Sequence, residues 1–378
     1  MSRHIIHLDL DCFFVACEVL RDSRLRGRPV IVGGQQGRGV VAACSYEARR
    51  FGVRAAMPIA YAKQRCPEAL VLQGDMELYS NYAKLVRTII REEAPLFEQA
   101  SIDEFYLDLS GMDHLRALHQ WGRELQALVQ RESGLQASFG LSINKSVAKM
   151  ATNEGKPGGH LEVPAIQVRP FLNPLSIEKI PQLGPKTFRR LTRVGIRQIK
   201  TLAEVPVAFV EHLLGKNGRI LWERANGIDP RPVVPYREQQ ALSAEQTLAT
   251  DSMDVLALKA LLTRLLTQLC FELRQAQKLT SILSVKIRYN NFDTYSRQRR
   301  IPYTDSDTYL TQLAHTLFDE LYTRRMRIRL VGVRLAGLVK GHPQIALFAD
   351  NQKDLALQQA LDEIRRKFGM EAVRRGIP

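Results

Sequence analysis

Residues 101–110, SIDEFYLDLS, carry the adjacent acids Asp103 and Glu104, and residues 5–14, IIHLDLDCFF, carry Asp9. Both runs are otherwise apolar and strand-like, and a lone charge buried in such a strand is costly. A divalent metal gives buried acids a reason to be there, because its charge relieves the repulsion between clustered carboxylates. Three acids that converge from two strands can hold the two-metal site used for phosphoryl transfer. The alternative, solvated turn residues, fits the apolar flanks less well.

The spacing of these acids limits how they can meet. The period of two in IIHLDL puts His7, Asp9 and Asp11 on one face of a strand. Asp103 and Glu104 are neighbours, so an ideal strand would point them to opposite faces. Both can serve one site only if the chain turns or twists between them.

The composition favours a polyanionic partner. The chain has 378 residues, with 54 Lys and Arg against 39 Asp and Glu, a formal net charge of +15. Such a surplus favours nucleic acid first and an acidic membrane surface second, with solubility alone as the alternative. The five cysteines show no CxxC pairing, which fits a reduced, cytoplasmic compartment. We expect no signal peptide, and no membrane span because no apolar run approaches about 20 residues.

Periodicity predicts an α+β organisation in the first half of the chain. The expected elements are strands at Ile5–Leu10 and Ala137–Ile143, strand, turn and strand within Ser101–Leu109, and helices at Met76–Glu93, at about 114–132 and from Asn144. Residues 12–74 read as a compact insert whose β-rich runs are Pro29–Gly34 and Gly39–Cys44. Without that insert, the order is compatible with a ferredoxin-like sheet covered by helices on one face.

The second half begins with a basic helical stretch, 166–234, and continues into another α/β unit. We expect there helices at Met253–Gln275 and about 306–323, with strands at Ser281–Tyr289, Thr294–Ile301 and Arg329–Leu338. An amphipathic helix at about Lys353–Phe368 follows. The domain count of two or more agrees with the length of the chain.

Five blocks carry a resemblance to a known family. They are HLDLDCFF (7–14), SYEARRFGVRAAMP (45–58), SIDEFYLDLSG (101–111), GLSINKSVAKMATNEGKPGG (140–159) and IPQLGPKT (180–187). In order and spacing they resemble Y-family, translesion DNA polymerases of the DNA polymerase IV type, over nearly the whole chain. The resemblance implies an α+β, multidomain, right-hand polymerase with a ferredoxin-like palm, small fingers, a helical thumb and an additional α/β little-finger domain. The expected ranges are 1–11 and 75–165 for the palm, 12–74 for the fingers, 166–234 for the thumb, 241–341 for the little finger and 342–378 for a C-terminal tail.

The resemblance also implies a function. The protein is expected to be a template-directed DNA polymerase of low fidelity that extends a primer 3′ end, bypasses damaged template and acts as a monomer. Two magnesium ions would be held by Asp9, Asp103 and Glu104, with help from the backbone carbonyl of Leu10. Asp11 and Asp108 match no metal ligand and are expected to be structural. Because every acid cluster is assigned, no segment suits a proofreading exonuclease.

Further positions match nucleotide contacts of the family. Phe14 would exclude ribonucleotides, because a 2′-hydroxyl would collide with its ring; a core phenylalanine is the alternative. The deoxynucleoside triphosphate would be held by Tyr46, Arg49 and Lys156. Many relatives have a threonine at Ala43. We therefore expect a weaker triphosphate contact there, or compensation by Ser45.

Two regions are expected to contact primer-template DNA. Residues 180–196 resemble a helix-hairpin-helix in which Gly184, Lys186 and Thr187 would meet a phosphate, although Gln182 replaces the usual first glycine. In the second α/β unit, Arg297 and Arg299 alternate on one face of a strand and would follow a phosphate backbone. An ordinary helical hairpin and a solvated sheet face are the alternatives.

The C-terminal tail contains QIALF at residues 344–348, which resembles the peptide that binds the bacterial sliding clamp. Gln344 would enter a polar pocket, and Leu347 and Phe348 would fill an apolar one. Two other functions compete with the polymerase. A catalytically dead, DNA-binding relative would lack the acid set, which is present here. A phosphatase that starts from the Asp-x-Asp of HLDLDC would leave the basic surplus and the hairpin unexplained.

Overall fold

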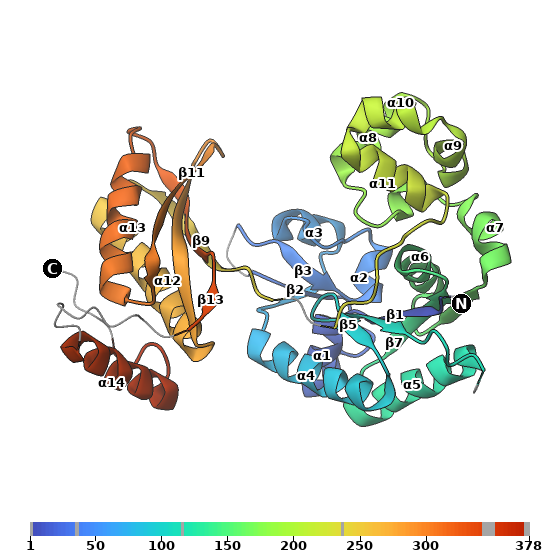
Figure 1. Cartoon of the computed structure of the whole chain (residues 1–378), viewed down its shortest axis with the longest axis horizontal. Coiled ribbons are helices and arrows are strands. Elements are labelled where there is room, and N and C mark those ends of the chain that lie inside the picture. The colour runs from blue at the N-terminus through green and yellow to red at the C-terminus, as the bar shows by residue number, and fades with distance from the viewer. Residues whose placement is uncertain (1–2, 35–37, 115–116, 236–237, 342–351, 374–378) are drawn as a thin grey trace. The chain divides into compact units, whose positions relative to one another are not determined.

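A computed structural model of the chain describes residues 3–34, 38–114, 117–235, 238–341 and 352–373, with side chains in the last segment from residue 356 on. The chain divides into two compact units, Met1–Arg237 and Glu238–Pro378 (Figure 1). Each unit combines helices with an antiparallel-rich sheet. Within those ranges, no helix has the length and hydrophobicity of a membrane span.

A five-stranded sheet forms the centre of the first unit. Its order is β5 (Phe97–Gln99), β6 (Glu104–Asp108), β1 (Ile5–Leu10), β7 (Ala137–Ser142) and β8 (His160–Val163). β1 is antiparallel to both β6 and β7. With α4 (Met76–Glu93) and α5 (Leu118–Ser133) as connections, the order β5-β6-β1-β7 is the ferredoxin-like arrangement that the sequence predicts.

Two strands of this sheet differ from the prediction. Ser101–Leu109 is not strand, turn and strand: the turn lies at 100–103, and the earlier strand is β5. β5 has only three residues, FEQ, too few to show a period of two. β8 was not predicted either, because the edge strand HLEV is largely exposed and only Val163 is fully buried.

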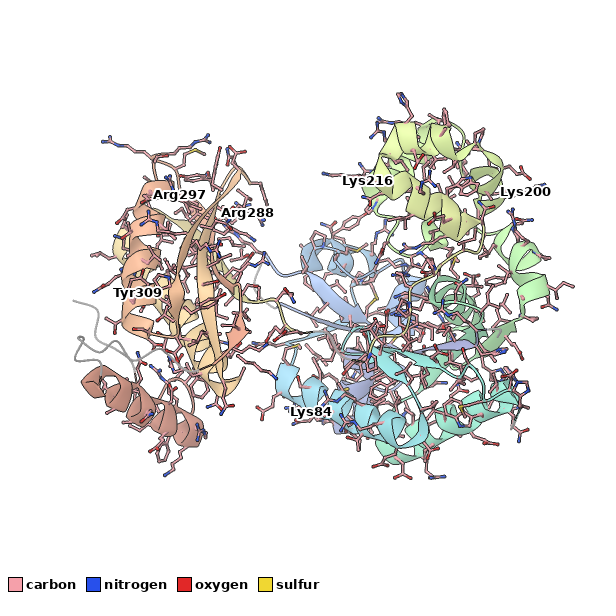
Figure 2. The ribbon with its side chains drawn as sticks, viewed as in Figure 1. Lys84, Lys200, Lys216, Arg288, Arg297 and Tyr309 are labelled. Atoms are coloured by element: carbon pink, nitrogen blue, oxygen red, sulfur yellow. The ribbon has the colours of Figure 1, made fainter. Side chains whose placement is uncertain are left out.

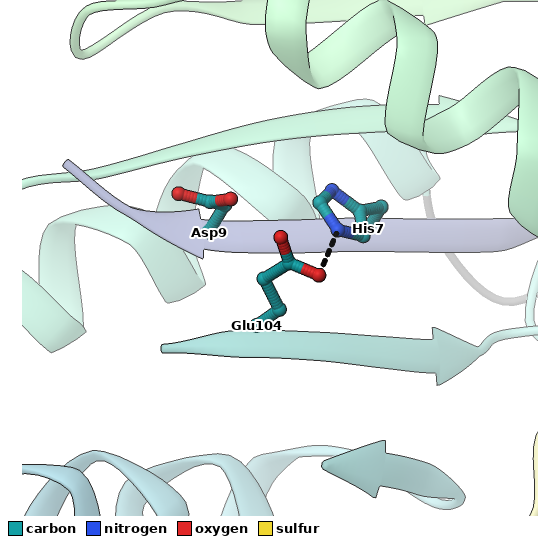
Figure 3. A group of neighbouring side chains, drawn as sticks. All are labelled: His7, Asp9 and Glu104. Atoms are coloured by element: carbon teal, nitrogen blue, oxygen red, sulfur yellow. Dashed lines mark ion pairs between the residues drawn. The ribbon is translucent and has the colours of Figure 1, made fainter. Parts of the chain in front are cut away.

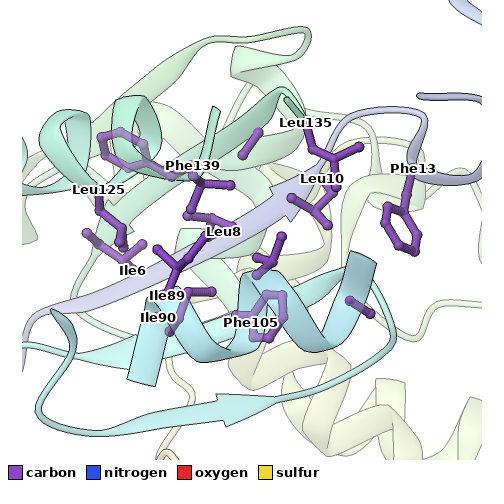
Figure 4. Close-up of a cluster of buried hydrophobic side chains, with 14 of the residues drawn as sticks. Ile6, Leu8, Leu10, Phe13, Ile89, Ile90, Phe105, Leu125, Leu135 and Phe139 are labelled. Atoms are coloured by element: carbon purple, nitrogen blue, oxygen red, sulfur yellow. The ribbon is translucent and has the colours of Figure 1, made fainter. Parts of the chain in front are cut away.

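The alternation of β1 separates an apolar face from a polar one. Ile6, Leu8 and Leu10 are buried in the main core. They pack with Phe105, Phe139 and apolar residues of α1 (Phe13–Arg21), α4 and α5 (Figure 4). The opposite face carries the polar side chains of β1 and is contacted by α6 (Lys145–Gly155). Apolar burial therefore fixes the register, and the register fixes which side chains reach the polar face.

A smaller three-stranded sheet follows β1 in sequence. Its order is β3 (Val41–Cys44), β2 (Val30–Gly33) and β4 (Leu70–Leu72), with η1 (Ser23–Leu25), α2 (Tyr46–Arg50) and α3 (Ile59–Arg65) beside it. Its own core contains Ile31, Val41, Ala48 and Ala62. The β-rich insert expected between 12 and 74 is therefore present, but Phe13, Val15 and Cys17 of α1 belong to the main core.

The rest of the first unit is helical. Its elements are η2 (Ala165–Gln167), α7 (Val168–Leu172), η3 (Ile177–Lys179), α8 (Pro185–Arg193), α9 (Ile199–Glu204), α10 (Val207–Leu214) and α11 (Lys216–Ala225). After α11 the chain returns to the central sheet. Asp229 Oδ2 accepts a hydrogen bond from Ser146 at 2.6 Å, and the Val234 N–H donates to Glu98 at 2.8 Å.

The second unit contains a four-stranded antiparallel sheet. Its order is β11 (Thr294–Thr304), β10 (Lys278–Tyr289), β12 (Ile328–Ala336) and β9 (Ala241–Ser252), with β13 (Val339–Lys340) also paired to β10. α12 (Val255–Gln275) and α13 (Asp307–Leu321) share its apolar core. β9 was not predicted, because more than half of ALSAEQTLATDS is polar and only Leu242 is buried.

The predicted C-terminal helix is confirmed as α14 (Gln352–Phe368). It is attached to the second unit by charged side chains. Arg274 binds Asp362 through two hydrogen bonds, at 2.6 and 2.9 Å, and Asp307 through one of 2.6 Å. Arg365 of α14, almost fully buried, lies 3.7 Å from Asp307. This helix is therefore docked on the second unit.

We predict that Gly140→Ala destabilises the first unit. A methyl group at Gly140 would lie 2.6 Å from the Thr152 nitrogen and against the Ala148 carbonyl, so α6 would have to move from β7. The expected loss in the free energy of unfolding is about 1–3 kcal/mol, measured by urea denaturation. Gly155→Ala is the control, because its methyl group would meet only ordinary contacts, the nearest at 3.6 Å. Equal stability of both variants would contradict this close packing.

Candidate active site and nucleic-acid interface

Acidic side chains from β1 and β6 meet on the polar face of the central sheet. Asp9 lies directly opposite Glu104 in the antiparallel register. Ligand atoms of Asp9, Glu104 and His7 all lie within 4.8 Å of one another (Figure 3). Asp9 is buried, and Glu104 is partly exposed, so this group is reached from one side.

The chain bends at residues 101–103, just before β6. Asp103 lies in the bend before Glu104, outside the strand. Its carbonyl accepts a hydrogen bond of 3.0 Å from the Leu10 N–H, which holds the bend against the end of β1. Ser101 Oγ donates to Asp103 Oδ1 at 2.6 Å. A bend is therefore present beside these acids, but the Asp103 carboxylate does not belong to the close group of His7, Asp9 and Glu104.

Lysines from α6 and from the turn after it neutralise the acids. Lys156 forms an ion pair with Asp9, and Lys149 donates to both Glu104 oxygens at 2.7 and 2.6 Å. Burial raises the pKa of Asp9 to about 7, supported by the nearby Glu104 and Asp103 charges and opposed by Lys156. Burial alone would raise the pKa of Glu104 too, but the nearby His7 and the hydrogen bonds from Lys149 outweigh it and bring it to about 2. A cation bound beside Asp9 would stabilise its ionised form and lower its pKa.

His7 belongs to this group, although no role was predicted for it. It is fully buried, and its Nδ1 lies 2.9 Å from Thr152 Oγ1. Its Nε2 lies 3.7 Å from Glu104 Oε2. Burial lowers the pKa of His7 to about 4, so the ring is neutral at pH 7. The period of two placed it on the same face as Asp9, and that was the available indication.

Asp11 has the structural role that was predicted. It is almost fully buried at the end of β1. Its carboxylate accepts hydrogen bonds from the Tyr46 hydroxyl at 3.1 Å, the Ser138 hydroxyl at 2.7 Å and the Gly158 N–H at 2.7 Å. One side chain therefore joins α2, β7 and the KPGG turn, which also carries Lys156.

The predicted nucleotide contacts gather around the same end of β1. Tyr46 and Arg49 lie on α2, with the Arg49 guanidinium carbon 4.8 Å from the centre of the Tyr46 ring. Phe14 is half-buried in the first turn of α1. The suggested compensation by Ser45 is not supported. Its buried hydroxyl already donates to the Arg28 carbonyl and accepts from the Val30 and Ala48 N–H groups.

The hairpin at 180–187 keeps a tight turn without the usual first glycine. Gln182 adopts φ 68°, a left-handed conformation that costs a residue with a side chain about 1 kcal/mol or more. Arg224 supports the turn by donating to the Pro181 carbonyl at 2.6 Å and to Gln182 Oε1 at 3.1 Å. Gly184 then caps α8, whose first turn contains Lys186 and Thr187.

Basic side chains beyond this hairpin are exposed. They are Lys186, Arg189, Arg190, Arg193, Arg197 and Lys200. Lys200 is labelled in Figure 2, where it projects from the helical part of the first unit.

The two faces of the second sheet carry different basic residues. Arg297 and Arg299 lie opposite Val285 and Leu283, which belong to the core shared with α12 and α13. Both guanidinium groups pair with Glu320 of α13 at 2.7 Å. They therefore lie at the edge of the helix-covered side (Figure 2 labels Arg297).

The other face of this sheet is the one that α12 and α13 do not cover. Its basic side chains are Lys286, Arg288, Arg300 and Arg334. Lys286 pairs with Glu245, and Arg288 donates to Thr294 Oγ1 at 2.8 Å. Arg300 and Arg334 are exposed. We call this set the open-face cations. The clamp-like residues Gln344, Leu347 and Phe348 lie outside the described part of the chain.

Sequence comparisons identify relatives of both units. The profile of the impB/mucB/samB family matches residues 8–153, and that of the impB/mucB/samB family C-terminal domain matches residues 239–347. DNA polymerase IV of Dehalococcoides mccartyi is 35% identical over 378 residues, covering 99% of this chain and 97% of the relative. DNA polymerase IV 1 of Bacillus subtilis is 34% identical, covering 99% and 93%.

Solved structures agree with these relatives. A Y-family DNA polymerase chimera of Dbh and Dpo4 matches with a TM-score of 0.80 and 25% identity, over 89% of this chain and all of the other. An insertion ternary complex of Dbh DNA polymerase matches over the same shares with a TM-score of 0.64 and 25% identity. Acids on adjacent strands, the ferredoxin-like sheet and full-length similarity thus lead to one assignment. The chain belongs to the DNA polymerase IV type of Y-family polymerases, which are DNA-directed DNA polymerases.

Proposed function

We propose that this protein extends a primer 3′ end opposite a damaged template, with low fidelity and without proofreading. The observation that carries the proposal is the meeting of Asp9 and Glu104 across β1 and β6, with the backbone of Asp103 bonded to Leu10 at the end of β1. Family membership supports the polymerase activity. We assign 1–11 and 75–165 to the palm, 12–74 to the fingers, 166–234 to the thumb, 241–341 to the little finger and 342–378 to the tail.

The donor set fits magnesium. Asp9, Asp103, Glu104 and the Leu10 carbonyl offer hard oxygen ligands, which this ion prefers. Burial is the main cause of the raised pKa of Asp9, with smaller contributions from the Glu104 and Asp103 charges, so a bound cation would stabilise its ionised form. Two bound magnesium ions would lower the pKa of the primer 3′-hydroxyl and neutralise charge on the triphosphate. The protein's part is to hold the acids in register and to keep their oxygens on one side of the sheet.

Three side chains would orient the triphosphate. Tyr46 and Arg49 present a hydroxyl and a planar guanidinium from α2, and Lys156 adds a mobile positive charge. Lys156 pairs with Asp9, so it lies beside the acid group where the reacting phosphate must arrive. Asp11 fixes the Tyr46 hydroxyl and the turn that carries Lys156. Ala43 adds no hydroxyl, so these contacts carry the binding.

Low fidelity follows from small side chains near the incoming base pair. Ala42 and Ala56 are exposed, and Met57 is partly exposed and flexible. Side chains of this size leave room for a mismatched or damaged template base. Phe14 would still check the sugar, because a 2′-hydroxyl would collide with its ring. Base and sugar are therefore selected by separate groups.

DNA would be held through its phosphates. The hairpin at 180–187 presents N–H groups and Lys186 at the start of α8. In the second unit we propose that the open-face cations follow the backbone, with Arg297 and Arg299 at the edge. The solved insertion ternary complex of Dbh DNA polymerase supports this use of the fold.

Two further assignments rest on sequence. The peptide QIALF at 344–348 would bind the sliding clamp, and the polymerase would act as a monomer. The five cysteines are free thiols, which suits a reduced, cytoplasmic compartment.

The central test is extension of a labelled primer by one deoxynucleotide with magnesium. We expect Asp103→Ala to lower the rate by at least about 10³-fold, because a ligand to the charge that develops in the transition state is lost. Binding of primer-template DNA, measured by fluorescence anisotropy, should change little. Asp108→Ala is the control, since this acid bonds only to Ser110 among the described residues. Full extension by Asp103→Ala would refute the assignment of Asp103 as a metal ligand. It would not support a catalytically dead relative or a phosphatase, because the protein would still extend the primer.

Sugar selection tests Phe14. Phe14→Ala should admit ribonucleotides by removing the ring that blocks a 2′-hydroxyl, with a gain of about 10²-fold or more in their relative kcat/KM. Phe51→Ala, a surface ring in the same insert, should leave selection unchanged. Unaltered discrimination in Phe14→Ala would exclude it as the gate.

The salt dependence of DNA binding tests the two faces of the second sheet. Removing Arg300 and Arg334 together should weaken binding to all sequences and reduce the slope of log K against log salt by about 1 for each lost phosphate contact. Removing Arg297 and Arg299 should have a smaller effect, because Glu320 already neutralises them. The opposite order would place DNA along the edge strand.

A further inference from the structure

The ring of Phe14 is supported from behind by a second aromatic ring. Phe14 stacks on Tyr79 of α4, with ring centres 4.4 Å apart and planes only 14° from parallel. Tyr79 is fully buried, whereas Phe14 is half-buried. Phe13 meets the same tyrosine edge-on, with ring centres at 6.3 Å. One face of the Phe14 ring is therefore covered by the ring of Tyr79, which is itself fully buried.

Tyr79 is in turn attached to a buried acid on the helix that carries Phe14. Its hydroxyl donates a hydrogen bond of 2.6 Å to Glu18 Oε1. Glu18 lies in α1 and is only 7% exposed, although its side chain is a carboxylate. Glu18 follows Phe14 by four residues, so both lie on the same side of α1. The chain of contacts Phe14–Tyr79–Glu18 thus returns to the helix where it starts.

The other Glu18 oxygen connects this group to the start of α4. Arg21 lies 3.9 Å from Glu18 Oε2 and 3.2 Å from Asp75 Oδ2. Asp75 caps α4 by accepting from the Leu78 N–H at 3.1 Å. The end of α1 and the start of α4, two helices from different parts of the sequence, are therefore tied together.

An acid in this place needs an explanation beyond packing. A buried carboxylate is costly unless it is hydrogen-bonded, and an apolar residue would fill the same space without that cost. The hydrogen bond to Glu18 is short, at 2.6 Å, and directional, so it restrains the rotation of the Tyr79 ring. A ring can exclude a hydroxyl only if its position is fixed. A shift of the ring that is small compared with its own size would already make room for the hydroxyl.

We propose that Glu18 is a positioning residue for sugar selection. Through the Tyr79 hydroxyl it holds the plane on which Phe14 rests, so that ribonucleoside triphosphates are rejected by a rigid surface. This inference rests on the proposed role of Phe14. It assigns a function to a buried acid that touches neither the nucleotide nor the acid group on β1 and β6.

The test compares single-nucleotide insertion of matched deoxy- and ribonucleoside triphosphates. Tyr79→Phe keeps the stacked ring and removes only the hydrogen bond. We expect the ratio of deoxy- to ribonucleotide kcat/KM to fall by about three- to tenfold, within what one charged hydrogen bond can supply. Glu18→Gln keeps an acceptor for the hydroxyl, so its ratio should stay within about twofold of the parent. Tyr82→Phe, the same change at a half-exposed site on α4, is the matched control.

A double variant keeps the test valid if a single change unfolds the protein. Glu18→Met with Tyr79→Phe removes both partners and leaves no buried polar atom unpaired, which proteins tolerate better than one orphaned group. Its discrimination should fall as far as that of Tyr79→Phe and no further, since both changes break one bond. Thermal midpoints of all variants check the fold. A structural role alone would lower insertion of both sugars equally and leave the ratio unchanged.

Two outcomes would overturn the inference, and they are distinguishable. If Phe14→Ala admits ribonucleotides while Tyr79→Phe and the double variant discriminate like the parent, Glu18 does not position the gate and the proposed function stands. If Phe14→Ala itself leaves discrimination unchanged, the gate assignment fails and the role of Glu18 fails with it.

Discussion

The burial of carboxylates on one face of a sheet is the constraint on which this structure depends. Asp9 and Glu104 face each other across an antiparallel pair, and the pKa of Asp9 is raised to about 7. The fold accepts this cost because the apolar faces of the same strands are buried in the main core, which fixes the register. Lys149 and Lys156 partly balance the charge from outside the sheet. Without these acids the fold would not bear the cost of burying charged side chains, so their presence indicates selection for chemistry.

The same logic extends to the residues around the acids. Asp11 and Glu18 are both buried carboxylates, yet neither belongs to the acid group. Asp11 accepts a hydrogen bond from the Tyr46 hydroxyl, and Glu18 accepts one from the Tyr79 hydroxyl. Each thereby links a helix or turn to the segment that follows β1. Buried acids at this end of the first unit therefore act as hydrogen-bond acceptors that set the position of aromatic side chains, and they hold parts of the chain that are distant in sequence.

Sequence patterns predicted the elements with strong periodicity and missed the others for physical reasons. Met76–Glu93 is a helix with the predicted bounds, because its apolar residues recur at helical spacing and Asp75 caps it. β5 and β8 were missed because three or four residues, partly exposed, carry little periodic information. The acids could be predicted because charge in an apolar strand is conspicuous. His7 was not, since a histidine on a strand has many uses, and only the fold brings it near Glu104.

The second sheet shows why alternation alone cannot assign a binding surface. A period of two correctly separates Arg297 and Arg299 from Arg300, but it does not say which face a helix covers. That depends on pairing: Arg297 lies opposite Val285, a core residue, whereas Arg300 lies opposite Ile282 on the other face. Helix α13 then supplies Glu320 to the covered side and neutralises the two arginines there. The register of β10 and β11 therefore places Arg297 and Arg299 beside a carboxylate and Arg300 on the opposite face.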